Sequence, residues 1–180
     1  NQSISICFPE VEIRYIVPET REIISVIEFM LERVRQQQGI YCVHSSSIIR
    51  NGKAMVFWGG ATSMGKSTAA IACGENESSV FAYDEKVLLN LDQRLVVGGI
   101  SSISLHKNIL KERFGKSEFV DVEVTQRVTE LDCMIYPIIA DVNSSVIERW
   151  DQSKFNWHLY EELNRKIRGC SRRIFNNSQP

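Results

Sequence analysis

The chain has 180 residues and a formal net charge of −1, with 21 Lys and Arg against 22 Asp and Glu. Hydrophobic residues make up 43 % and charged residues 24 %, which excludes a disordered polar chain and suits one domain with a sizeable core. No window approaches the roughly 18 consecutive apolar residues of a spanning helix, and no basic excess is available for nucleic-acid phosphates. We therefore expect a single domain over residues 1–180 that binds neither a membrane nor nucleic acid.

The cysteines are widely spaced and odd in number. A disulfide framework favours an even number, and a zinc site favours closely spaced pairs. We therefore expect reduced thiols in a cytoplasmic protein. No signal peptide is expected, because Asn1 to Phe8 has neither a basic stretch nor a long apolar run. The first residue is not Met, which leaves open that the chain is part of a longer protein. The five cysteines are Cys7, Cys42, Cys73, Cys133 and Cys170.

The first 38 residues predict a hairpin followed by a helix. Residues 3–8 and 11–17 alternate apolar and polar side chains around Pro9-Glu10, as in two antiparallel strands. A helix opens at residues 18–20, has a basic last turn and ends at Gly39. We expect it to be a packing element, and residues 1–38 to form a partly separate subdomain. Its apolar residues at helical spacing are Ile23, Ile24, Ile27, Met30, Leu31 and Val34.

The next segment predicts a second hairpin. Apolar strands over residues 41–50 and 54–58 flank Asn51-Gly52, a pair that favours the positive φ angles of a type I′ turn. The strand that leads into Gly59-Gly60 should therefore have an antiparallel neighbour. Beyond it we expect helices over 67–73, 106–114 and 157–168, the last ended by Gly169, and strands over 80–83, 87–90, 95–97, 100–105 and 132–140.

One motif indicates chemistry. Residues 60–67, Gly-Ala-Thr-Ser-Met-Gly-Lys-Ser, fit the phosphate-loop pattern GxxxxGK[ST] without a mismatch, between a predicted strand and a predicted helix. The glycines let backbone N–H groups point at phosphate oxygens, and the helix N-terminus favours the same anion. A chance match in a glycine-rich turn is the alternative. The expected nucleotide-binding residues are Gly60, Ala61, Thr62, Ser63, Met64, Gly65, Lys66, Ser67 and Thr68.

Three more side chains are candidates for the chemistry. Asp84 ends a predicted strand after the loop helix, so it can lie beside the phosphates, bind Mg²⁺ with Ser67, and accept a proton from an attacking hydroxyl. A solvated strand end is the alternative for Asp84 and for Glu85. His44 lies near the loop end of the hairpin, although a lone histidine is more often structural.

These residues together resemble the catalytic domain of HPr kinase/phosphorylase, and its small divergent relatives in particular. The resemblance covers about residues 43–105 and rests on His44, GGATSMGKST and Asp84. It implies an α/β phosphate-loop domain of the HPr-kinase and phosphoenolpyruvate-carboxykinase type, with a mixed sheet, antiparallel hairpins and flanking helices. It also implies His44, Lys66, Ser67 and Asp84 as the site. The family's Asp-Asp pair is Tyr83-Asp84 here, and Thr68 stands where the bacterial enzyme typically has Glu.

The expected function is an ATP-dependent kinase that requires Mg²⁺ and phosphorylates a hydroxyl group, with Lys66, His44 and Asp84 as catalytic residues and Asp84 as base. The acceptor would be a serine of a protein or peptide, or a small-molecule alcohol. ATP and GTP are not distinguished by the loop, and a homo-oligomer is possible. The alternative is a nucleotide-binding regulatory module with little or no phosphotransfer. A carboxykinase acting on an oxo acid is a weaker third hypothesis, because the chain is short.

Overall fold

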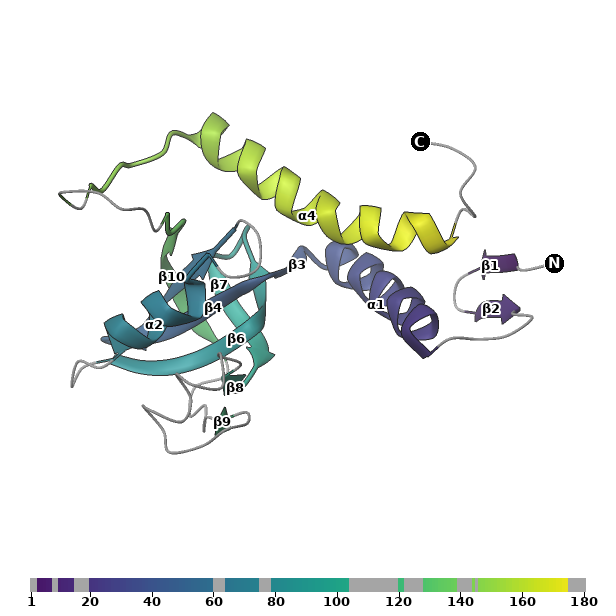
Figure 1. Ribbon diagram of the computed structural model, residues 1–180, viewed down its shortest axis with the longest axis horizontal. Helices are drawn as coiled ribbons and strands as arrows, with labels where there is room; N and C mark the ends of the chain where they lie inside the picture. The colour runs from purple at the N-terminus through teal and green to yellow at the C-terminus, as the bar shows by residue number, and fades with distance from the viewer. Residues whose placement is uncertain are drawn as a thin grey trace.

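The computed structural model describes residues 3–7, 10–14, 20–59, 64–74, 79–103, 120–121, 128–138, 144 and 146–174. Its helices are α1 (Thr20–Gln37), α2 (Lys66–Gly74) and α4 (Gln152–Ile174). Its strands are β1 (Ser3–Cys7), β2 (Glu10–Arg14), β3 (Ile40–Val43), β4 (Ser45–Arg50), β5 (Lys53–Trp58), β6 (Ser79–Asn90), β7 (Leu95–Ile100), β8 (Ser102–Ile103), β9 (Val120–Asp121) and β10 (Thr129–Ile135). The fold is α/β, with a mixed sheet and flanking helices (Figure 1).

Five strands of the larger sheet close into a ring. The order is β6-β4-β5-β10-β7, and β7 returns to pair with β6. Strand β3 pairs with the second half of β6, along the edge opposite to β7. All these pairs are antiparallel except β5 and β10. The predicted antiparallel neighbour of β5 is therefore confirmed, and the turn that joins it has the expected positive φ angles at Asn51 (52°) and Gly52 (76°).

The strand that bears Asp84 was predicted too short. Residues 80–83 and 87–90 belong to one continuous strand, β6, which runs past Asp84 to Asn90. Its second half forms an antiparallel hairpin with β7. The single predicted strand over 41–50 bends at His44 and gives β3 and β4, which both pair with β6. Since β4 is antiparallel to both neighbours, β6 runs in the direction of β5 with β4 between them.

Two apolar clusters hold the sheet to its helices. The larger cluster includes Val43, Val56, Trp58 and Leu89, and Leu159 of α4 joins it. The smaller cluster, Ile48, Phe57 and Ala70, lies on the opposite face of β4 and β5 and fixes α2 there. Alternation along β5 explains the division, because Val56 and Trp58 face one cluster while Phe57 between them faces the other. The start of α2 is thereby held against β4, β5 and β6.

The two long helices lie side by side beside the ring of strands (Figure 1). Helix α1 matches the predicted helix and also contacts β3. Helix α4 begins before the predicted residue 157 and continues through Gly169, so the prediction that this glycine ends the helix is wrong. A single glycine costs a helix only about 1 kcal/mol relative to alanine, which neighbouring helix formers can offset.

The N-terminal hairpin is confirmed as the two-stranded sheet β1-β2, separate from the larger sheet. Whether residues 1–38 form a subdomain stays a prediction. The strand predicted over 132–140 begins earlier, at Thr129, and ends at Ile135. The helix predicted over 106–114 lies outside the described residues, and so does residue 104 onward of the strand predicted over 100–105. Among the described helices, none combines the length and apolar character needed to cross a membrane.

Cys133 on β10 offers a test of the packing between β10 and its neighbours. Cys42, Cys73 and Cys133 are free thiols, and Cys73 is exposed. Burial, assisted by the charge of Asp132, raises the pKa of the Cys133 thiol. The thiolate is the reactive form, so we expect iodoacetamide to alkylate Cys133 more slowly than Cys73 at neutral pH, with a rate that still rises above about pH 9. Mass spectrometry of peptides after timed alkylation measures both rates, and equal rates would contradict the packing.

Candidate functional site

The phosphate-loop motif lies where β5 ends and α2 begins. Trp58 ends β5, Gly59 follows with φ +87°, and α2 starts at Lys66. Gly60, Ala61, Thr62 and Ser63 lie outside the described residues. Met64 and Gly65 lead directly into the helix, and the Ala69 N–H donates to the Gly65 carbonyl oxygen at 2.8 Å, which closes the first turn. The strand and the helix that the motif requires on either side of it are therefore present.

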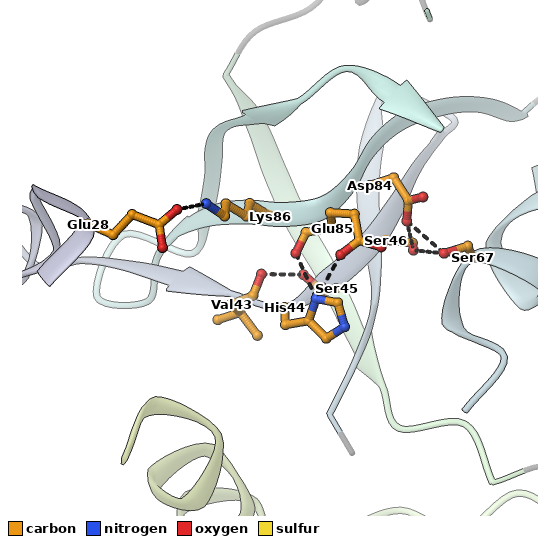
Figure 2. Close-up of polar contacts among 9 residues, drawn as sticks. All are labelled: Glu28, Val43, His44, Ser45, Ser46, Ser67, Asp84, Glu85 and Lys86. Atoms are coloured by element: carbon orange, nitrogen blue, oxygen red, sulfur yellow. Dashed lines mark hydrogen bonds and ion pairs between the residues drawn. The ribbon is translucent and has the colours of Figure 1, made fainter. Parts of the chain in front are cut away.

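The side chains at the start of α2 differ in exposure. Lys66 is buried, with 6 % of its surface exposed, whereas Thr68 is exposed. Lysine is almost never buried without an interaction partner, and Lys66 has one within the chain. Its position in the motif, rather than its burial, makes it a functional candidate. Ser67 is partly buried and points toward β4 and β6 (Figure 2). Lys66 and Ser67 thus lie against the sheet, and Thr68 faces outward.

A cluster of three oxygen atoms joins α2 to the sheet. The hydroxyl of Ser67 donates to Asp84 Oδ1 at 2.7 Å, and the hydroxyl of Ser46 donates to the same oxygen (Figure 2). The two serine oxygens are 3.1 Å apart. Because each hydroxyl has one proton, donation of both to Asp84 leaves no proton between the serine oxygens. The carboxylate therefore holds both hydroxyls, and Asp84 itself is only 1 % exposed.

A β-bulge in β6 brings Asp84 to this face of the sheet. Ser47 pairs with Tyr83 while Ile48 pairs with Phe81, so Ala82 is an extra residue without a partner on β4. Phe81 packs against the cluster beneath α2, and Asp84 is three positions further on. In a regular strand, residues three apart face opposite sides of the sheet. The extra residue shifts the alternation and turns Asp84 toward Ser67.

His44 lies at a second irregularity of the same strand pair. It occupies the bend between β3 and β4, opposite a stretch of β6 where Glu85 has φ +62° and the pairing with β7 shifts. His44 Nδ1 is 2.9 Å from the Glu85 carbonyl oxygen and 3.4 Å from Glu85 Oε2. A carbonyl oxygen can only accept, so Nδ1 bears the proton and Nε2 of the neutral ring is left as the acceptor.

The structure brings Ser67 and Asp84 into contact, as expected for residues predicted to share a metal ion. His44 is two residues before Ser46 on the same chain segment, but its recorded partner is Glu85. Sequence reasoning missed Ser46. The signal for it was present in part, because the Asn51-Gly52 turn fixes the β4–β5 register and places Ser46 on the same face as Ile48. The bulge at Ala82, which aligns Asp84 with it, has no comparable signal.

One pair of oxygen atoms in the cluster has a spacing close to that of neighbouring magnesium ligands. Mg²⁺ binds hard oxygen ligands at about 2.0–2.1 Å in octahedral geometry, so neighbouring ligands are about 2.9 Å apart. The 2.7 Å between Ser67 Oγ and Asp84 Oδ1 is close to that value. The described part of the chain contains no group of three or more His, Cys, Asp or Glu suited to a metal. A site of one carboxylate, one hydroxyl and substrate phosphates is, however, the usual arrangement for Mg²⁺.

No family model, no curated protein and no solved structure matches this chain. The site is therefore interpreted from its own residues: a phosphate-loop motif, a buried lysine, and a carboxylate held by two serine hydroxyls.

Proposed function

We propose that this chain is a phosphate-loop kinase, similar in its site to the catalytic domain of HPr kinase/phosphorylase, which transfers the γ-phosphoryl group of ATP to a hydroxyl group. The observation that supports this most is the 2.7 Å hydrogen bond from Ser67 to Asp84. It joins the last residue of the GxxxxGKS motif to a carboxylate on the strand after the loop helix. Phosphate-loop enzymes hold their metal ion with the loop Ser or Thr and such an aspartate.

The proposal assigns a role to each residue. Backbone N–H groups of residues 60–65 and the positive end of α2 bind the phosphates, and the Lys66 ammonium group adds a positive charge beside them. Ser67 and Asp84 hold Mg²⁺, which, when bound, offsets charge on the phosphate oxygens. Ser46 donates to Asp84 and keeps its carboxylate directed at Ser67. Lys66 is buried where α2 begins, at the position that the motif gives to the phosphate-binding lysine.

Two residues are candidates for taking the proton of the acceptor hydroxyl. Asp84 is proposed as the base, as in the family that the site resembles. Its burial and its bonds to Ser46 and Ser67 support the metal role at least as well. His44 has its Nδ1 proton held by the Glu85 carbonyl oxygen, so its Nε2 can accept a proton or a hydrogen bond. We propose that His44 positions the acceptor.

The acceptor is proposed to be a serine of a protein or peptide, or a small-molecule alcohol. No described residue distinguishes these two classes, and none distinguishes ATP from GTP. The family that the site resembles phosphorylates a carrier-protein serine. Tyr83 in place of that family's first aspartate argues against simple transfer of this substrate.

A nucleotide-binding regulatory module is the second candidate function, and one observation favours it. Asp84 is almost completely buried, and its Oδ1 already accepts from two hydroxyls. A base must reach the proton that it removes, within about 2.6–3.2 Å. If the acceptor cannot reach Asp84, nucleotide binding would change conformation or assembly without phosphoryl transfer.

The first experiment incubates the protein with γ-labelled ATP, Mg²⁺ and a cell extract fractionated by size. We expect label on an acceptor, and a loss of about 100-fold or more in the Lys66→Ala variant, because a charged group next to the transferred phosphoryl group is removed. Label in the macromolecular fraction would identify a protein or peptide kinase. Label on a small organic molecule would identify a metabolite kinase.

The matched control is Lys53→Ala. Lys53 is exposed at the start of β5, away from the loop, and pairs with Glu130 at 2.9 Å. The hydrogen bond to Glu130 raises the pKa of Lys53, so its ammonium group is charged at neutral pH, as we expect for Lys66. Because Lys53 lies away from the loop, we expect it to make no contact with the phosphates. Transfer should be unchanged in the control. Label that stays on ATP, or is released only as phosphate, would support the regulatory module instead.

A further inference from the structure

Strand β6 departs from its partner strands beside the oxygen cluster. Residues 44–46 and 84–86, all of which the structure describes, face each other without pairing, although β3 and β4 pair with β6 on either side of them. Glu85 and Lys86 are also extra residues relative to β7, because consecutive residues of β7 pair with Asp84 and with the residue after Lys86. Such bulges redirect side chains and are common next to active sites.

Glu85 has a backbone conformation that glutamate rarely adopts. Its φ of +62° lies in the left-handed region, which is accessible mainly to Gly, Asn and Asp. Asn51 and Arg94 share this region, but each lies in a turn between two strands, whereas Glu85 lies within β6. Strained residues persist only where their surroundings hold them, and they gather at functional sites. The contacts of Glu85 therefore indicate what this conformation is for.

The contact that Glu85 makes is with the ring of His44. Nδ1 of His44 lies 2.9 Å from the Glu85 carbonyl oxygen and 3.4 Å from Glu85 Oε2 (Figure 2). The carbonyl oxygen and the carboxylate are both acceptors, so both favour the tautomer of the neutral ring that has its proton on Nδ1. In a regular strand this carbonyl group would point toward a neighbouring strand instead. The left-handed conformation of Glu85 and the orientation of His44 are therefore linked.

We propose that Glu85 is a positioning residue for the proposed phosphoryl transfer: its left-handed backbone fixes the His44 ring with Nε2 as the hydrogen-bond acceptor for the hydroxyl group that is phosphorylated. In this tautomer the hydroxyl group donates to Nε2 and keeps the lone pairs of its oxygen for the phosphorus. An N–H at Nε2 would instead donate to that oxygen and engage a lone pair. The His44 side chain is 24 % exposed, so a substrate can reach it. The inference rests on the proposed function and gives Glu85 a role in it.

Nitrogen NMR of the histidine rings tests the tautomer without any substrate. The chain has three histidines, so the signals of His44 are those that disappear in His44→Gln. At about pH 8.5, where a histidine with an ordinary pKa is neutral, we expect a proton on Nδ1 of His44 and none on Nε2. A proton mainly on Nε2 in the unaltered chain would overturn the proposal. Glu85→Asn should keep the pattern, because Asn tolerates a positive φ, whereas Glu85→Val should give a mixture of tautomers, because a β-branched residue opposes it.

Arg94→Val is the matched control for backbone strain. Arg94 has φ +55° and is exposed in the turn between β6 and β7, so valine meets the same conflict there, away from His44. Both valine variants should be less stable in urea, but only Glu85→Val should alter the signals of His44. The same change in both variants would show that strain anywhere in β6 and β7 releases the ring, and would overturn the proposal. Circular dichroism checks that each variant remains folded.

Transfer of label from γ-labelled ATP to the cell extract tests the positioning role. We expect Glu85→Val to lower the rate by about 10-fold, the scale of one positioned hydrogen bond, and Glu85→Asn and Arg94→Val to leave it nearly unchanged. In a His44→Gln chain, Glu85→Val should cause no further loss, because Glu85 acts through His44. An equal loss with and without His44 would assign Glu85 a merely structural role and overturn the proposal. If the unaltered chain transfers no label, the proposed function fails, and the NMR pattern decides separately whether Glu85 fixes the ring.

Discussion

Asp84→Asn is expected to lower phosphoryl transfer by about 1,000-fold or more, the scale of losing a general base together with a charged metal ligand. Asparagine has almost the same volume and keeps a carbonyl oxygen that can accept from Ser67 and Ser46. The variant should therefore fold and retain the hydrogen bonds of the oxygen cluster. It loses the negative charge and cannot take up a proton under the conditions of the assay.

The measurement compares transfer from labelled ATP with ATP affinity by calorimetry, with and without Mg²⁺. If Asp84 is the base, affinity stays nearly intact while transfer disappears. If phosphoryl transfer and ATP affinity fall by the same factor, and affinity falls only when Mg²⁺ is added, Asp84 would be assigned to metal binding. Asp92→Asn is the control, since Asp92 is exposed in the turn between β6 and β7 and its change should alter neither quantity. Undiminished transfer in Asp84→Asn would remove this residue from the mechanism.

Gly59→Ala is expected to destabilise the fold by about 3 kcal/mol or more, through backbone strain and a steric clash together. Gly59 has φ +87°, a conformation that alanine adopts only with strain. A Cβ atom at this position would overlap the ring of Tyr136. The ring cannot easily move, because its edge packs against Trp58, with centroids 5.6 Å apart, and it also contacts Trp150 at 5.0 Å.

Gly52→Ala is the control that separates the two causes. Gly52 has φ +76°, close to that of Gly59, but a Cβ atom there would have no neighbour within 4 Å. Its cost should be limited to the backbone strain, about 1 kcal/mol. Urea unfolding followed by tryptophan fluorescence gives both free energies. Similar losses of unfolding free energy in the two variants would show that the ring of Tyr136 moves aside for the added Cβ atom. The packing of Tyr136 beside Gly59 would then be less rigid than we expect.

Local signals in the sequence were sufficient for several elements. Asn51-Gly52 specifies its own turn by the φ angles that these two residues tolerate, and the antiparallel β4–β5 pair follows from it. The phosphate-loop motif specifies the strand before it and the helix after it. The apolar spacing of α1 also gave the helix correctly, but not the side that it buries. That choice depends on Glu32 and Cys42, which are ten residues apart and meet only in the folded chain.

The parts that the sequence did not reveal depend on pairing across the sheet. Asp84 was expected at the end of a strand, because an acidic pair after four apolar residues resembles one. In the structure the strand continues, since Val87 and Leu89 add to the large core beyond the acidic pair. The bulge at Ala82 and the positive φ at Glu85 are responses to two different partner strands, β4 and β7. No local pattern in the sequence encodes either irregularity.

The closed ring also determines when the protein can complete its folding. Its one parallel contact joins β5 to β10, and Lys53 and Glu130 in that contact are 77 positions apart in the chain. Contacts between distant segments form slowly, because a long loop must close first. Until β10 inserts between β5 and β7, both strands have unpaired edges, which attract other chains. During synthesis on the ribosome, the phosphate-loop strand thus emerges long before the strand that covers its edge.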